Sequence, residues 1–171
     1  ADPVKTERWR QRLTSLGPGP KVGLSWRGGT ANTRAKLRSL AVPDLARLIR
    51  GSRATFVSLQ YGEIDADLRE LRDAYGIELL HFPEVIPDYD ETAALVAALD
   101  HVVSVCTSLV HLTGALGRPC TVLVPSVPEW RYCVAGEDMP WYPSVRLVRQ
   151  QRDEQWSTVI DRLKSELAVA A

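Results

Sequence analysis

Short apolar runs alternate with longer segments of helical periodicity along most of the chain. The apolar runs predict buried β-strands at residues 21–26, 55–59, 77–80, 102–105, 121–124 and 145–148. The spacing of apolar residues and the Gly and Pro positions predict helices at residues 4–16, 43–49, 65–75, 92–99, 108–116 and 156–167. Strands that are apolar on both faces and alternate with helices are typical of a parallel sheet covered on both sides. The pattern therefore predicts a Rossmann-like, doubly wound α/β fold with a mainly parallel sheet.

The length of 171 residues fits one domain, which we expect to run over residues 1–171. Within it we expect a leading helix at 1–18, an α/β core at 20–150 and a closing helix at 155–168. A Gly-Pro-Gly-Pro run separates the leading helix from the core.

The balance of charged residues and the lengths of the apolar stretches limit the kinds of partner that we expect. Lys and Arg together number 21, as do Asp and Glu, so the formal net charge is zero. A nucleic-acid-binding domain usually carries a basic excess, and we therefore expect no nucleic-acid partner. The longest apolar stretches are far shorter than the ~20 residues of a spanning helix, and the first residues lack the apolar core of a signal peptide. We expect no membrane span and a cytoplasmic protein.

The cysteines and histidines do not predict a metal site. Cys106, Cys120 and Cys133 are odd in number and lack a CxxC spacing, which argues against a disulfide framework or a zinc site and fits a reducing compartment. The three histidines are scattered without the spacing of metal ligands. We therefore expect no bound metal.

The loop after the first predicted strand is the first candidate for ligand binding, because open α/β sheets bind ligands at the carboxyl ends of their strands. It begins with Trp26, Arg27 and Gly28 and ends near Arg38. Glycines let backbone amides approach a ligand closely, and cations complement phosphate. The same loop also fits a solvated surface segment, and both interpretations stay open.

The second candidate is the start of the predicted helix at 108–116. Cys106 ends a buried strand, and Thr107 and Ser108 open the helix, where free amides and the helix dipole favour an anion. His111 lies one turn further, on the face that these residues share. The alternative is that Thr107 or Ser108 caps the helix and His111 is a core residue.

The third candidate is an aromatic and basic loop that contains Trp130 and Arg131 and continues to Trp141 and Tyr142. Aromatic rings beside an arginine can stack on a nucleobase or a sugar. They can equally pack a loop against the core, and we expect this for Trp141 and Tyr142. The length of the loop keeps a binding role open.

Several segments together resemble a known family. They are KVGLSW at 21–26, RSL at 38–40, FVSLQ at 56–60, ETAAL at 91–95, HLTGALGRP at 111–119 and WYPSVRL at 141–147. In this order, and over nearly the whole chain, they resemble bacterial tetratricopeptide-repeat glycosyltransferases, whose catalytic region is similar to heptosyltransferases of family 9. The resemblance implies one half of a GT-B fold, namely the C-terminal half that binds the nucleotide-sugar donor.

The resemblance also implies roles for residues. Donor-site residues are Trp26, Arg27, Gly28, Arg38, Cys106, Thr107, Ser108 and His111, with Gln60, Trp130 and Arg131 as contacts of the base or sugar. Thr107, Ser108 and His111 would hold the diphosphate. Such enzymes invert the configuration at the anomeric carbon of the sugar. They use no metal and no cofactor besides the nucleotide sugar, because helix ends and cations neutralise the departing diphosphate.

Two departures from the family bear on activity. Relatives usually carry Asp where this chain has Cys106, and a thiol does not accept charged hydrogen bonds as a carboxylate does. The acceptor half, which would hold the general base, and any tetratricopeptide repeats are missing from this chain. We therefore expect it to bind donor without turnover when isolated, with the missing N-terminal half or repeats as partners.

Two other interpretations remain. A degenerate, noncatalytic GT-B-like domain would serve as a scaffold or interaction module. Another nucleotide-binding enzyme, such as a dehydrogenase, is disfavoured because no GxGxxG follows the first strand.

Overall fold

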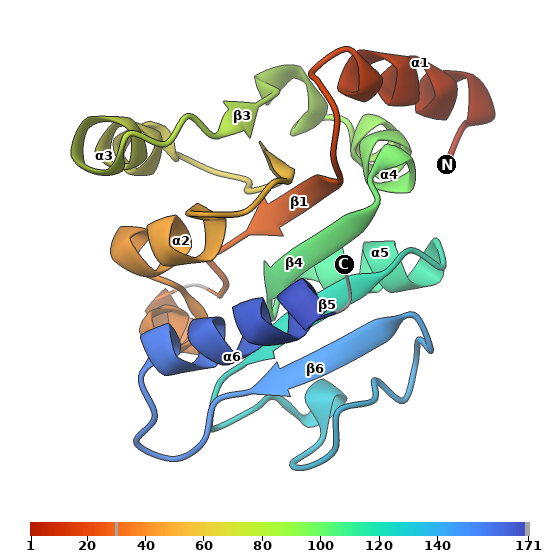
Figure 1. Cartoon of the computed structure of the whole chain (residues 1–171). Helices are drawn as coiled ribbons and strands as arrows, with labels where there is room; N and C mark the ends of the chain where they lie inside the picture. The colour runs from red at the N-terminus through yellow and green to blue at the C-terminus, as the bar shows by residue number, and fades with distance from the viewer. Residues whose placement is uncertain (30, 170–171) are drawn as a thin grey trace.

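A parallel sheet forms the centre of the chain, whose structure is a computed structural model that describes residues 1–29 and 31–169. Thr30, in the first candidate loop, and residues 170–171 lie outside the described part. The strands are β1 Lys21–Ser25, β2 Thr55–Ser58, β3 Leu80–His81, β4 His101–Val105, β5 Cys120–Val124 and β6 Val145–Arg149. All pairs are parallel, in the order β3-β2-β1-β4-β5-β6 (Figure 1). The predicted fold class is confirmed.

Helices cover both faces of this sheet. They are α1 Pro3–Thr14, α2 Val42–Ile49, α3 Asp65–Tyr75, α4 Tyr89–Ala98, α5 Ser108–Ala115 and α6 Trp156–Val169. Apolar side chains of α2, α3 and α6 form one buried layer with the sheet, and those of α1, α4 and α5 form the other. Figure 1 shows α6 in front of the strands and α2 beside the end of β1. Four short 3-10 turns, η1 Ala31–Thr33, η2 Ala35–Arg38, η3 Pro83–Val85 and η4 Trp130–Tyr132, were not predicted.

The predicted strand at 77–80 is largely wrong, because its first residue, Ile77, takes part in closing the preceding helix α3. Gly76 adopts a left-handed conformation, and its N–H and that of Ile77 bind the carbonyls of Arg72 and Leu71. This is the usual way in which a glycine closes a helix. The strand therefore begins only at Leu80.

The strand order reverses between β1 and β4, which are neighbours at the centre of the sheet. The chain leaves β1 toward α2 on one face and leaves β4 toward α5 on the other face. Crevices at such a reversal, outside the carboxyl ends of the strands, are where open α/β sheets bind ligands. The fold thus brings the first two candidate loops of the sequence to one place.

The connection from β5 to β6, residues 125–144, contains no α-helix in its described structure, only the turn η4. Tyr132 and Met139 of this connection are buried and cover the sheet beside α5. The guanidinium of Arg149, at the end of β6, binds the carbonyls of Tyr132, Cys133, Ala135 and Gly136. The connection is therefore held by side chains rather than by regular secondary structure.

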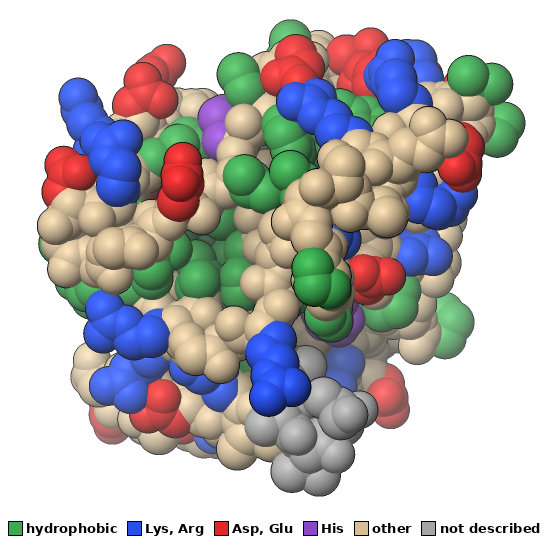
Figure 2. All heavy atoms as spheres, turned by 45° about the horizontal axis from the view of Figure 1, so that its top comes forward, with side chains coloured by type: hydrophobic (Ala, Val, Ile, Leu, Met, Phe, Trp, Pro, Cys, Tyr) green, Lys and Arg blue, Asp and Glu red, His purple; other side chains and the backbone are tan. Residues whose placement is uncertain are grey.

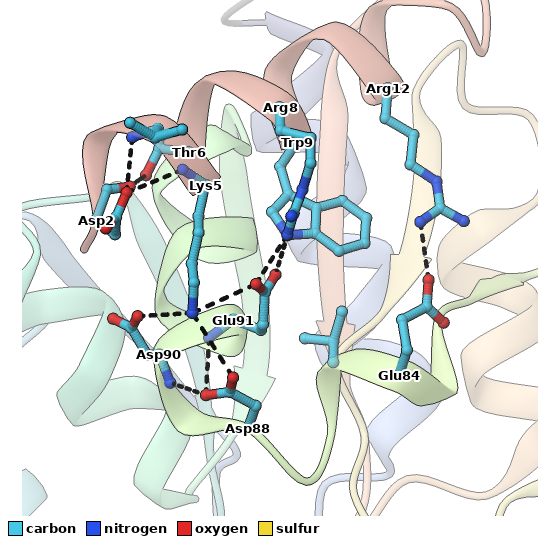
Figure 3. Close-up of polar contacts among 12 residues, drawn as sticks. Asp2, Lys5, Thr6, Arg8, Trp9, Arg12, Glu84, Asp88, Asp90 and Glu91 are labelled. Carbon is cyan, nitrogen blue, oxygen red and sulfur yellow. Dashed lines mark hydrogen bonds and ion pairs between the residues drawn. The ribbon is translucent and has the colours of Figure 1, made fainter.

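The first helix lies against α4 through buried apolar residues and a charged network (Figure 3). Trp9 and Leu13 are buried, and the Trp9 indole donates a 2.9 Å hydrogen bond to the Glu91 carboxylate. Lys5 and Arg8 bind the same carboxylate from the exposed side. Leu16, the last residue of the helix predicted at 4–16, lies beyond the observed end of α1 and is 40% exposed.

Candidate functional site

A cavity of about 360 Å³ lies at the carboxyl ends of the central strands. Its lining comes from the loops after β1, β2, β4 and β5 and consists of Gly29, Arg38, Tyr61, Cys106, Thr107, Ser108, His111, Glu129, Arg131 and Tyr132. Six of the eleven residues that the sequence assigned to a donor site are in this set: Arg38, Cys106, Thr107, Ser108, His111 and Arg131. The cavity coincides with the reversal of strand order.

The first turn of α5 forms one side of the cavity. Thr107 occupies the N-cap position, but its side chain makes no capping bond and its hydroxyl instead lies 3.1 Å from the Ser104 hydroxyl. Ser108 is exposed and lines the cavity. The leading amides of α5 therefore have no side-chain cap, and together with the helix dipole they favour a negatively charged ligand at this place.

His111 lies one turn further along α5 and is half-buried. Its ring centroid lies 5.8 Å from that of Tyr142 and 6.3 Å from that of Tyr132. Burial, and after it the charge of Arg131, holds the pKa of His111 below its usual 6.5. The imidazole is thus packed on one side, lines the cavity on the other, and is neutral at pH 7, where one ring nitrogen donates a hydrogen bond and the other accepts one.

Two arginines share one carboxylate inside the cavity. The Arg38 guanidinium, almost entirely buried, lies 2.6 Å from one oxygen of Glu129, and Arg131 lies 3.8 Å from the other oxygen. Arg38 also donates to the backbone carbonyl of Cys106. The cavity therefore holds two cationic groups, one anionic group and the positive end of a helix.

The thiol of Cys106 does not present a polar group to the cavity. It is fully buried, its Sγ lies 3.8 Å from the Leu123 carbonyl, and burial raises the pKa of its thiol to about 12. The thiol is therefore protonated at neutral pH, which is the state of an inert structural cysteine. Toward the cavity, Cys106 offers its carbonyl, which Arg38 binds.

Three predicted residues of the loop after β1, Trp26, Arg27 and Gly28, do not line the cavity. Trp26 is 1% exposed, packs in the core and donates to Asp67 at 2.7 Å. Arg27 pairs with the same carboxylate at 3.3 Å. A Cβ on Gly28 would lie 3.0 Å from the carbonyls of Arg38 and Cys106, so glycine lets the loops after β1 and β4 meet.

Gln60 is buried and holds this arrangement together. Its Oε1 accepts the backbone N–H groups of Trp26 and Arg27, at 2.9 and 2.8 Å. Its Nε2 donates to the carbonyls of Arg27 and Tyr61. Because each polar atom of this amide already has a partner within the protein, the structure places Gln60 as a support of the loop. The neighbouring Tyr61 lines the cavity instead.

Some side chains of the aromatic loop pack against the core, and others lie in solvent. Tyr142 packs against the core over Gly114, as expected, whereas Trp141 is 55% exposed, so the expectation that it packs inward is wrong. Trp130 is 71% exposed, meets Trp141 edge-on at 6.2 Å and lies under the Arg131 guanidinium.

The site residues predicted from the sequence do not include four that line the cavity: Gly29, Tyr61, Glu129 and Tyr132. Glu129 and Tyr132 flank the predicted Trp130 and Arg131, and Tyr61 follows Gln60, so proximity in sequence was the signal available. Nothing local identifies Glu129 as the partner of Arg38, because the two belong to different loops.

A second hollow, of about 510 Å³, lies between α2 and α6, away from the strand ends. Its charges satisfy one another: Arg47 pairs with Asp161 at 2.7 Å, and Lys164 binds the carbonyls of Arg47 and Arg50. A cation at this end of α2 also complements the helix dipole. The hollow is therefore explained by helix packing.

On the face that Figure 2 shows, basic and acidic side chains are mixed over most of the surface. Within the described residues, no helix is long and apolar enough to cross a membrane. In the same part of the chain, no three or more His, Cys, Asp or Glu side chains group in a way that would hold a metal ion.

Comparison with known proteins places this geometry in context. No family model matches the chain. In sequence it is similar to Protein FlbA of Caulobacter vibrioides, with 31% identity over 169 residues that cover 97% of this chain and 28% of that protein. The chain thus spans little more than a quarter of the length of this curated relative.

In structure the chain is similar to one half of several glycosyltransferases. It matches the ADP-heptose LPS heptosyltransferase II of E. coli with a TM-score of 0.68 and 16% identity, over 99% of this chain and 53% of that one. E. coli heptosyltransferase WaaC with ADP gives a TM-score of 0.68 and 16% identity, over 95% and 48%. A family 9 glycosyl transferase of Veillonella parvula gives 0.52 and 10%, over 95% and 44%. The chain therefore has the fold of one heptosyltransferase half.

Proposed function

We propose that this chain is the donor-binding half of an inverting, metal-independent glycosyltransferase whose donor is a nucleotide-diphosphate sugar. The observation that carries the proposal is the cavity at the reversal of strand order, where the uncapped start of α5 meets His111, Arg38 and Arg131. A diphosphate is the ligand chemistry that suits a helix N-terminus flanked by arginines. The match to heptosyltransferase halves over nearly the whole chain supports it.

The proposed mechanism is electrostatic. The leading amides of α5 and the Ser108 hydroxyl bind one phosphate, and Arg131, Arg38 and His111 bind the other. These donors stay in place while the sugar leaves, so they stabilise the charge that develops on the departing diphosphate without a metal. Tyr61 and Trp130 offer exposed ring faces at the same end of the sheet for the base or the sugar.

The acceptor and the general base belong to the rest of a longer protein in this proposal. The matched heptosyltransferase structures are about twice as long as the chain, and the curated relative is longer still. The missing half, or tetratricopeptide repeats before it, would close the cavity and supply the base. We place the whole protein in the cytoplasm, with no nucleic-acid partner.

The test is calorimetric titration of the folded chain with ADP, GDP and UDP. We expect one of them to bind, and we expect His111→Ala and Arg131→Ala each to weaken binding about tenfold, as the loss of one charge-assisted hydrogen bond would. Arg152→Ala, an exposed position outside the cavity, is the matched control and should leave binding unchanged. Absence of binding at millimolar nucleotide, or binding that both cavity variants leave intact, would contradict the proposal.

One observation favours a second candidate, a degenerate domain that acts as a scaffold. Cys106 stands where the resembling glycosyltransferases carry Asp, and its buried, protonated thiol supplies no charge to the cavity. A scaffold would bind none of the three nucleotides while folding normally. The titration therefore separates the two candidates.

A further inference from the structure

We infer that Glu129 is an internal anion: its carboxylate occupies the position at which the phosphate of the proposed ligand would bind, and the ligand must displace it to bind. This inference rests on the proposed function, because it concerns the same cavity. In this view the Glu129 carboxylate competes with the diphosphate, and it sets how tightly and how selectively the diphosphate binds.

The contacts of Glu129 are those expected of a bound phosphate. One oxygen lies 2.6 Å from Nη1 of Arg38 and the other lies 3.8 Å from Nη1 of Arg131. All three side chains line the cavity that the start of α5 faces. The pKa of His111 is lowered by burial and by Arg131, and the Glu129 carboxylate acts in the opposite direction. Glu129 therefore lies near a second residue that is proposed to bind the diphosphate.

A buried arginine explains why such a partner is needed. The side chain of Arg38 is only 11% exposed, and a buried charge without a counter-ion is strongly unfavourable. Glu129 satisfies this charge within the protein. A phosphate that arrives at Arg38 would satisfy it equally well, so the two anions exclude one another at the same guanidinium.

The exchange requires only the Glu129 side chain to move. The backbone just after it is fixed, because Tyr132 is buried and its carbonyl binds Arg149, while the Arg131 carbonyl accepts the Trp141 indole N–H at 3.1 Å. The Glu129 side chain itself is 26% exposed and has solvent on one side. A rotation about its own bonds therefore frees both arginines and leaves the loop in place.

The consequence is a selection on ligand charge. A ligand with two linked phosphates can replace both arginine contacts at once and gains enough to expel the carboxylate. A ligand with a single carboxylate only exchanges one anion for another of similar strength. Glu129 thus favours diphosphates over weaker anions and loosens every anionic ligand that binds.

The experiment compares Glu129→Gln with the unaltered chain, using whichever of ADP, GDP and UDP binds. Gln keeps the size of the side chain and removes its charge, so we expect about tenfold tighter diphosphate binding. Glu137→Gln, an exposed carboxylate paired with Arg146, is the matched control and should not change affinity. The uncharged nucleoside with the same base should bind both forms equally.

A second variant guards against misfolding of the first. Glu129→Asp keeps the charge but shortens the reach to both arginines, and we expect a smaller tightening. If the unaltered chain binds a diphosphate and neither variant binds it more tightly, the inference is wrong and the proposed function stands. If no form binds any of the three diphosphates, the proposed function fails and the inference fails with it.

Discussion

The side-chain amide of Gln60 binds both backbone polar groups of Arg27: its Oε1 accepts the N–H at 2.8 Å, and its Nε2 donates to the carbonyl at 3.1 Å. One side chain at the end of β2 therefore fixes the first residues of the loop after β1. This contact fixes the backbone just before Gly28 and Gly29, and Gly29 forms part of the cavity wall. The contact is also testable on its own.

Gln60→Ala should destabilise the fold by about 1–3 kcal/mol, because the backbone N–H groups of Trp26 and Arg27 then lose a buried acceptor. Denaturant unfolding measures the change. Gln151→Ala removes an exposed amide and should leave the free energy of unfolding unchanged. Equal stability of the two variants would show that the loop does not depend on Gln60.

Gly114→Ala should also be destabilising, because a Cβ there would overlap the Tyr142 ring. Overpacking of this kind costs about 1–3 kcal/mol. The matched control is the same substitution in a Tyr142→Ala background, where the clash is absent and the added cost should nearly vanish. Costs that simply add would mean that Tyr142 does not press on α5.

The attachment of α1 should weaken in acid. Hydrogen bonds from Arg8 and Trp9, together with Lys5, hold the pKa of Glu91 at about 2, below its usual 4.5. Because the unfolded chain binds the proton more readily, this contribution is complete above about pH 4.5 and is lost as the pH falls through about 2. Figure 3 shows the groups involved.

Unfolding by denaturant at pH 5.5, 4.5 and 3.5 measures this effect. The stability difference between the unaltered chain and Glu91→Gln should shrink as the pH falls, since protonation makes the two side chains alike. Glu78→Gln, at an exposed position, should show a constant difference. A constant difference for Glu91→Gln as well would refute the assigned role.

The three thiols should differ in reactivity. Burial raises the pKa of Cys106 and of Cys120 to about 12, whereas Cys133 is exposed. Titration with Ellman's reagent should detect one thiol in the native chain and three after unfolding. Cys133→Ser should abolish the native signal, and a persistent fast reaction in that variant would show that a buried thiol is accessible.

Most elements were predictable because their signals are local. Residues 65–75 show helical spacing, and the helix observed over Asp65–Tyr75 follows it. The start of α5 was predictable because Thr107 and Ser108 directly follow a buried strand. Strand β3 was mispredicted because Ile77 is apolar enough for a strand while its backbone closes α3.

The cavity was only partly predictable because its contacts join distant loops. Trp26 follows a strand end, which suggested a cleft residue, but the direction of its side chain depends on packing with α3 and on Asp67. The pairing of Arg38 with Glu129 likewise depends on how the loops after β1 and β5 meet. Neither relationship leaves a local pattern in the sequence.

The four carbonyls that converge on Arg149 have a consequence for how this site can change. Because one guanidinium at the end of β6 holds four carbonyls at 132–136, this part of the 125–144 connection keeps its course without a helix or a strand. Trp130, which is 71% exposed, lies outside this stretch, so its replacement would leave the four carbonyl contacts of Arg149 in place. Arg149 thus gives the connection a frame that does not depend on the exposed side chain of Trp130 at its rim.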